Sequence, residues 1–378
     1  MAKYKSLKNQ SAKKEESQNN SDETLQDVNG LSPVKNISRA KTYLAIGATV
    51  LIILVILFGF YIYSNAVLRH KIPPVQNVNI ALKWVHQSQF AGNYVAQEKG
   101  FYSNFHGINA TFMPYNFKDS PIDLVVSGKA KFGVAGADEI MLARSKGIPV
   151  KAVAVIYQVN PVCAFALKSS GIARPQDFVG KRIGIEKGIN VEYEYNAMME
   201  NLKINRSTLT EVGIGYVAAE LLNGSVDVST GYVINEPYYA ISAGKDVNII
   251  MVEDYGVNMY ADVLFTTDEL IKTNPELVNN FVQGTIDGWQ YTMEHQSEAV
   301  DIVLRYAKTA SLNHEVYALQ ASIPLINTGE VPIGSMNAEG WSNVKHALLL
   351  QKLLSGDVNI SDCYTTQFID SRDVRNKI

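Results

Sequence analysis

From Asn77 onward, short apolar runs typical of buried strands alternate with amphipathic stretches of about ten residues that are typical of helices. Parallel strands need such crossover connections, so the alternation predicts an α/β protein with largely parallel sheets. The first set of predicted strands is 77–84, 110–116, 131–136 and 150–158, and the helices between them are 89–100, 121–129 and 138–147.

The alternation restarts at Ala164 and then returns to a strand at 261–267. The second set has strands 164–167, 181–186, 209–215, 226–233 and 247–252, with helices 192–202 and 216–225, and helices 267–292, 294–307, 314–323 and 341–354 close the chain. We therefore expect two α/β lobes, with lobe 1 formed by 77–165 plus 262–370 and lobe 2 by 166–261. Ligands bind at the carboxyl ends of strands in such sheets, which places the expected site in a cleft between the lobes.

Residues 42–68 carry no charged side chain, and 43–64 are apolar enough to cross a bilayer, which takes about 20 helical residues. A buried core helix and a cleaved signal peptide are the alternatives. The length argues against the first, and the long leader without a clear small-residue cleavage site argues against the second. We predict a disordered cytoplasmic tail over 1–42, a transmembrane helix over 43–64 and a linker over 65–76.

The charges around this segment predict its orientation. Lys35, Arg39 and Lys41 precede it, and basic residues favour the cytoplasmic side. The expected location is therefore the cell membrane, with a single pass and the α/β domain outside the cytoplasm.

Composition excludes several classes of function. The net charge of −3 offers no basic surface for nucleic acid. The two cysteines, Cys163 and Cys363, make neither a disulfide framework nor a metal cluster, and whether they pair stays open. No nucleophile elbow, phosphate-binding loop or zinc-protease motif occurs, so we expect no enzyme activity, no metal and no cofactor.

Several segments, in order, resemble the family that groups SsuA-like solute-binding proteins with thiamine-pyrimidine synthases. They include KWVHQSQFAGNYVAQEKGFY (83–102), GYVINEPYY (231–239) and DYGVNMYADVLFTT (254–267). The resemblance implies the type II periplasmic-binding-protein fold, two lobes that close on a small ligand, and an ABC importer permease and ATPase as partners. The opening segment is most similar to the branch that binds thiamine pyrimidine precursors.

The resemblance also implies site residues in the first lobe. In the pyrimidine-precursor branch a Trp at the end of the first strand stacks on the heterocycle, which is Trp84 here. His86 and Gln89 follow in the turn and could reach a ring edge, although His86 could instead cap the helix. Asp138 begins a helix beside small residues, where capping alone also explains it, and Tyr157 ends the strand that enters the crossover.

In the second lobe, Glu192 and Glu194 match a segment whose carboxylate faces the cleft in the family, and could accept hydrogen bonds from an aminopyrimidine. Two acids in a helix turn are otherwise simply solvated. Asn235 and Glu236 follow a strand and form the counterpart of the Trp84 turn. Because Arg144 and Arg182 lie away from strand ends, a neutral or cationic heterocycle fits better than a sulfonate.

The sequence thus predicts a membrane-anchored binding protein for a small nitrogen heterocycle, of the hydroxymethylpyrimidine or formamidopyrimidine type. The alternatives are an alkanesulfonate, nitrate or riboflavin-like ligand, or a ligand sensor. A pyrimidine-synthase-like enzyme is the least favoured reading, because residues 134–139 contain neither the Lys nor the His that such chemistry implies at that turn.

Overall fold

The computed structural model describes residues 39–68, 75–215, 218–354 and 358–369 of the chain. The chain forms two compact units, Met1–His70 and Lys71–Ile378.

The described part of the first unit is one helix, α1 (Arg39–Leu68), which contains the predicted anchor. Large apolar side chains of this helix, such as Leu51 and Phe58, are exposed. Within the part of the chain that the structure describes, no helix is long and apolar enough to cross a membrane. The anchor therefore stays a prediction. Residues 1–38 of the predicted tail and 69–74 of the predicted linker lie outside the described residues.

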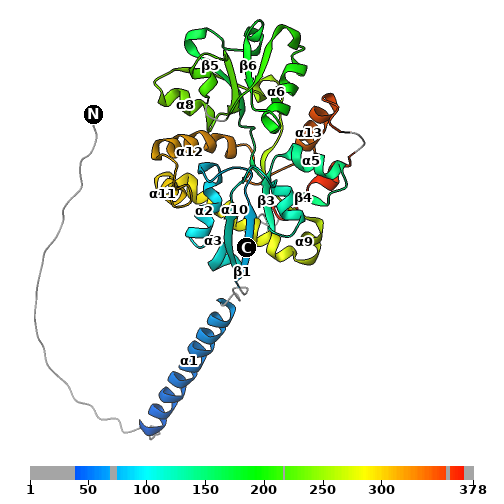
Figure 1. Ribbon diagram of the computed structural model, residues 1–378. Helices are drawn as coiled ribbons and strands as arrows, with labels where there is room; N and C mark the ends of the chain where they lie inside the picture. The colour runs from blue at the N-terminus through cyan, green and yellow to red at the C-terminus, as the bar shows by residue number, and fades with distance from the viewer. Residues whose placement is uncertain (1–38, 69–74, 216–217, 355–357, 370–378) are drawn as a thin grey trace, which may run out of the picture. The chain divides into compact units, whose positions relative to one another are not determined.

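The second unit contains two five-stranded sheets, which confirms the expected α/β architecture (Figure 1). The first sheet has the order β2-β1-β3-β10-β4 and the second β7-β6-β8-β5-β9. Within the first, β10 runs antiparallel to both neighbours, and within the second, β5 does. The strands are β1 (Gln76–Ala81), β2 (Ile108–Met113), β3 (Phe132–Ala135), β4 (Val150–Tyr157), β5 (Val162–Leu167), β6 (Arg182–Ile185), β7 (Thr210–Gly213), β8 (Val228–Tyr232), β9 (Val247–Met251) and β10 (Ala261–Thr267).

Each sheet with its helices forms one lobe, and the chain passes between lobes from β4 to β5 and again from β9 to β10. β5 begins at Val162, whereas the predicted second lobe begins at 166. The helices of the second unit are α2 (Ala91–Glu98), α3 (Phe101–His106), α4 (Pro121–Val126), α5 (Ala137–Ser145), α6 (Asn190–Asn201), α7 (Ala219–Leu222), α8 (Glu236–Ser242), α9 (Asp268–Thr273), α10 (Pro275–Glu294), α11 (Gln296–Tyr306), α12 (Leu312–Ile326), α13 (Ala338–Leu350) and α14 (Ile360–Cys363).

The predicted helix 267–292 is wrong in one respect, because the structure has two helices there, α9 and α10. Pro275 begins α10, and its ring disfavours helical backbone at Asn274. Asn274 instead caps α10, since its side chain accepts a hydrogen bond from the Leu277 backbone N–H at 3.1 Å. Pro275, which lies inside the predicted helix 267–292, was the sequence signal for this break.

Helices α2 and α10 pack closely because each presents a glycine to the other. A Cβ atom at Gly288 would lie 2.0 Å from the Gly92 carbonyl oxygen, and one at Gly92 would lie 2.3 Å from the Trp289 ring. Any side chain at either position must push the helices apart. This contact supports η1 (Ser88–Phe90) and the turn before it, which lie at the start of α2.

We expect Gly288→Ala to lower the free energy of unfolding by about 1–3 kcal/mol, the usual cost of overpacking a core. Urea denaturation would measure the change. Gly215→Ala is the matched control, because a Cβ there meets nothing within 4 Å. Equal stability of the two variants would contradict the close packing of α2 on α10.

Candidate functional site

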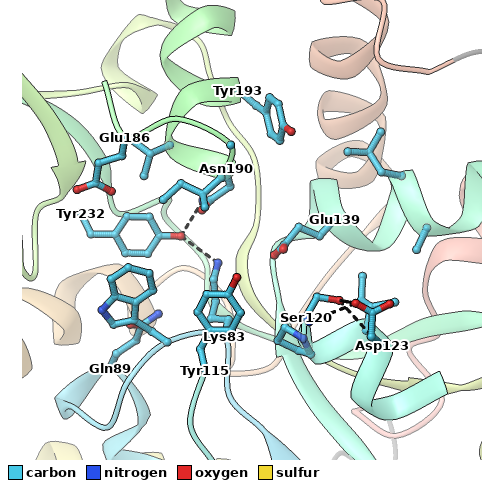
Figure 2. A pocket seen from close by; sticks show the side chains of 18 of the residues that line it. Lys83, Gln89, Tyr115, Ser120, Asp123, Glu139, Glu186, Asn190, Tyr193 and Tyr232 are labelled. Carbon is cyan, nitrogen blue, oxygen red and sulfur yellow. Dashed lines mark hydrogen bonds between the residues drawn. The ribbon is translucent and has the colours of Figure 1, made fainter. Parts of the chain in front are cut away.

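A cavity of about 430 Å³ lies between the two lobes, and its lining comes from the carboxyl ends of strands in both sheets (Figure 2). Lys83 and Trp84 follow β1, Tyr115 follows β2, Glu186 follows β6, and Tyr232 ends β8. These positions are where open α/β sheets bind ligands. The cavity therefore lies where the sequence pattern predicts a cleft.

Trp84 and Tyr115 form an aromatic wall on the first lobe. Their ring centroids are 6.4 Å apart with an angle of 24° between the ring planes, and the Tyr115 backbone N–H donates to the Trp84 carbonyl oxygen at 3.0 Å. The edge of Phe117 lies against Trp84, with centroids 5.6 Å apart. Such a wall can stack against a flat ring.

Lys83, which was not among the predicted site residues, connects the lobes. Its Nζ donates to the Tyr232 hydroxyl oxygen at 3.0 Å, and the Asn190 Nδ2 donates to the same oxygen at 2.7 Å (Figure 2). Nζ also lies 3.6 Å from Asp262 Oδ1. Burial alone would lower the pKa of Lys83, but Tyr232 and Asp262 outweigh it and hold that pKa well above its ordinary value. Lys83 is thus a buried ammonium group.

Gln89 contacts Asp262, the carboxylate that pairs with Lys83, and is 3% exposed. Its Nε2 donates to Asp262 Oδ2 at 2.7 Å, and its Oε1 accepts from Gln87 Nε2 at 2.7 Å. Asp262 has a φ of 49°, which is unusual for a residue with a side chain and marks local strain. The amide of Gln89 therefore holds the side chain of a residue with a strained backbone at the return crossover.

Burial raises the pKa of several acidic side chains in and around the cavity. Burial, with the charge of Glu236, raises the pKa of Glu186 to about 10. Burial is also the main reason why the pKa of Glu194 rises to about 8, that of Glu236 to about 7 and that of Asp138 to about 6. Among the described residues, the buried Glu186 Oε1 has no hydrogen-bond partner.

Four of the nine predicted site residues line the cavity, namely Trp84, Gln89, Asn235 and Glu236. The Asn235 Nδ2 donates to Glu236 Oε1, and Glu236 Oε2 accepts from the Tyr232 backbone N–H at 2.6 Å. The binding role of all four residues stays a prediction. The position of Asn235 and Glu236 just after β8 agrees with it.

The other five predicted residues lie outside the cavity lining. The His86 ring nitrogen is 2.8 Å from the Tyr94 hydroxyl, the Tyr157 hydroxyl donates to Ser322 Oγ at 2.8 Å, and Glu192 accepts from the Gly188 backbone N–H at 2.8 Å. Asp138 and Glu194 are buried, at 2% and 1% exposure, and each has one carboxyl oxygen without a partner among the described residues.

Sequence reasoning missed several cavity residues. The lining residues that were not predicted include Lys83, Tyr115, Glu186, Asn190, Tyr193 and Tyr232. Lys83 and Glu186 each follow an apolar run at a strand end, and that position was an available signal. Tyr232 also ends a strand, but its contact with Lys83 depends on the approach of the other lobe.

The raised pKa of Glu194 predicts that stability falls as pH rises. The folded chain keeps this proton up to about pH 8, whereas the unfolded chain loses it near pH 4.5. Between these values the folded state binds more protons than the unfolded state, so a rise in pH lowers the free energy of unfolding. We expect the midpoint of thermal unfolding to fall between about pH 5 and 9, and to fall less in Glu194→Gln, which cannot ionise.

Glu200→Gln, at an exposed position of the same helix, is the matched control for that measurement. It should show the full pH dependence of the unmodified chain. A Glu194→Gln chain with the same pH dependence as the control would contradict a buried, protonated Glu194.

Comparison with known proteins agrees with this geometry. Riboflavin-binding protein RibY of Chloroflexus aurantiacus is 29% identical over 309 residues, which cover 79% of this chain and 87% of that protein. The formylaminopyrimidine-binding protein of Halalkalibacterium halodurans is 26% identical over 301 residues, covering 77% and 90%. The 4-amino-5-hydroxymethyl-2-methylpyrimidine phosphate synthase of Legionella pneumophila is 25% identical over 298 residues, covering 77% and 92%.

Solved structures share the fold. The periplasmic aliphatic sulphonate-binding protein SsuA of Escherichia coli superposes with a TM-score of 0.62 at 14% identity, covering 76% of this chain and 91% of that one. This likeness confirms the expected periplasmic-binding-protein fold and carries no information about the ligand. The family model described as NMT1/THI5 like matches residues 87–299, more than half of the 378 residues. The chain belongs to the NMT1/THI5-like family.

Proposed function

We propose that this chain is the extracytoplasmic solute-binding protein of an ABC importer, and that its ligand is a planar nitrogen heterocycle. The observation that carries the proposal is one cleft in which the Trp84–Tyr115 wall meets the carboxyl group of Glu186 and the amides of Asn190 and Asn235 from the other lobe. Two relatives are named for riboflavin and formylaminopyrimidine, both of which contain flat nitrogen heterocycles. An aminopyrimidine of the thiamine-precursor type remains the first candidate.

The hydrogen-bonding groups support a ring with mixed donors and acceptors. A carboxyl with a pKa of about 10, as at Glu186, is protonated at neutral pH and offers one O–H donor and one carbonyl acceptor. The Asn235 side chain adds an amide to the lining. A ring nitrogen beside an amino group, or a ring N–H beside a carbonyl, complements such a pair.

A sulfonate or nitrate ligand is less well supported. Oxyanion sites usually present arginine or several free amides, and no arginine lines the described cavity. Arg144 Nη1 lies 2.6 Å from Asp268 Oδ2, and Arg182 Nη2 lies 2.7 Å from Asp227 Oδ1. The lysine nearest the aromatic wall, Lys83, already pairs with Asp262.

We propose binding without catalysis, because the turn over residues 134–139 supplies neither lysine nor histidine. Under this proposal, permease and ATPase subunits of the importer receive the ligand. An anchor over 43–64 would hold the domain close to them and raise its effective concentration. This proposal rests on the uncharged, apolar run and on its length of about 20 residues.

Trp84→Ala should weaken ligand binding about tenfold or more, because it removes a stacking surface. Trp84→Phe keeps an aromatic ring and should lose less. Calorimetric titration of the full-length chain with hydroxymethylaminopyrimidine, formylaminopyrimidine, riboflavin and a small alkanesulfonate measures the effect and tests the ligand class. Val126→Ala, at an exposed site outside the cavity lining, is the control. Unchanged affinity in Trp84→Ala would remove Trp84 from the site.

Deleting residues 43–64 should release the protein from the membrane fraction, whereas deleting residues 1–38 should leave it there. Alkaline extraction of membranes from producing cells, followed by immunoblotting, distinguishes the two outcomes. A full-length chain found mainly in the soluble fraction would contradict the proposed anchor.

A further inference from the structure

The cavity has two ends that differ in chemistry. We call the group Tyr232, Asn235, Glu236, Glu186 and Gln89 the head end, because polar groups converge there. The second group, Pro121, Ile122, Leu142 and Ile148, comes from the start of α4 and from α5 and the turn after it, and we call it the apolar end.

Figure 2 separates the two ends. Glu186 and Tyr232 lie on one side of the view, while Ser120 and Asp123, which flank Pro121 and Ile122 in the chain, lie on the other. Lys83 and Tyr115 lie between them. The cavity is therefore a trough that runs from the polar groups of β6 and β8 to the apolar groups of α4 and α5.

The side chains of the apolar end are held in place by local structure. Ser120 caps α4, since its Oγ accepts from the Asp123 backbone N–H at 3.1 Å, while its own N–H donates to Asp123 Oδ2 at 3.2 Å. The Ile148 backbone N–H donates to the Ala143 carbonyl oxygen at 3.1 Å, which folds Ile148 back beside α5. These hydrogen bonds fix the backbone that carries the apolar side chains.

The polar groups near this end do not compete for an anion. Asp123 Oδ2 already accepts from the Ser120 hydroxyl at 2.6 Å. Lys146, the one cation that lines this end among the described residues, is exposed, and Asp123 in the same lining carries the opposite charge. An uncharged apolar group fits such a surface best.

The size of the cavity gives a second, independent argument. A volume of about 430 Å³ lies within the range of roughly 300–1,000 Å³ that is typical of pockets for drug-sized ligands. A one-ring aminopyrimidine is smaller than such a ligand, so it would leave part of the trough to water. The unfilled part would include an apolar surface, whose burial would otherwise favour binding.

We propose that the ligand has two parts, a heterocyclic head bound at the head end and a second, apolar ring or fused ring system that lies on Leu142, Ile148 and Ile122. This inference rests on the proposed function and makes its ligand class narrower. An aminopyrimidine of the thiamine-precursor type is then the candidate for the head, and the second ring extends it.

Two series of compounds test the proposal by calorimetric titration of the full-length chain. Uracil, lumazine and lumichrome share one dione edge and have one, two and three rings, and only lumichrome carries a dimethylbenzene part. Hydroxymethylaminopyrimidine and diaminopteridine extend an amino edge in the same way. We expect affinity to rise at least tenfold from the one-ring to the largest member of at least one series, since each addition buries more apolar area.

Variants then locate the second part. Leu142→Ala and Ile148→Ala should each weaken the largest member about fivefold and leave the one-ring member of the same series within about twofold. Val126→Ala, exposed on α4 and outside the lining, should change neither. Thermal unfolding of each variant checks its fold. If a variant does not fold, the compound series on the unmodified chain decides alone.

The outcomes separate this inference from the proposed function. Equal affinity for one-ring and larger members, or equal losses for both in Leu142→Ala and Ile148→Ala, would overturn the two-part ligand and leave a heterocycle site standing. Binding of no heterocycle of any length would refute the proposed function, and the inference with it.

Discussion

The hydrogen bond from Lys83 Nζ to the Tyr232 hydroxyl joins the two lobes at the centre of the cleft. Lys83 follows β1, and Tyr232 ends β8, so this contact links the strand ends of the two sheets. Asp262, at the return crossover, lies 3.6 Å from the same ammonium group. A buried ammonium needs such partners, and removing them would leave an uncompensated charge. The Lys83 ammonium group therefore contacts both the cleft and the crossover segment that contains Asp262.

A second chain of polar contacts joins the lobes through α12. The Ser88 backbone N–H donates to Glu315 Oε2 at 2.6 Å, and the His314 ring nitrogens lie 3.1 Å from Glu315 Oε1 and 2.9 Å from Asn235 Oδ1. Since Asn235 also donates to Glu236, its amide orientation is fixed from both sides. The head end of the cavity is thus held by residues from α12 and η1 of one lobe and from the β8–α8 turn of the other.

Much of the fold could be predicted from periodicity, because strands and crossover helices leave distinct patterns over whole segments. Trp84, Asn235 and Glu236 could also be predicted to line the cleft, since Trp84 ends a predicted strand and the other two lie just after one. Glu194 was predicted as a cleft carboxylate, yet it is buried beside Asn190, because which face of α6 packs inward depends on the sheet beneath it. The role of Tyr232 depends on Lys83, 149 positions away in the chain, so no local pattern reveals it.

The most direct test of the central claim, that this cleft binds a flat nitrogen heterocycle, is to identify a small molecule that the protein selects by itself. Full-length protein can be incubated with a small-molecule extract of the producing cells, recovered and denatured, and the released compounds identified by mass spectrometry. The account predicts enrichment of an aromatic nitrogen heterocycle, and loss of that enrichment in Trp84→Ala. Enrichment of a sulfonate or another non-aromatic anion, unaffected by Trp84→Ala, would contradict it.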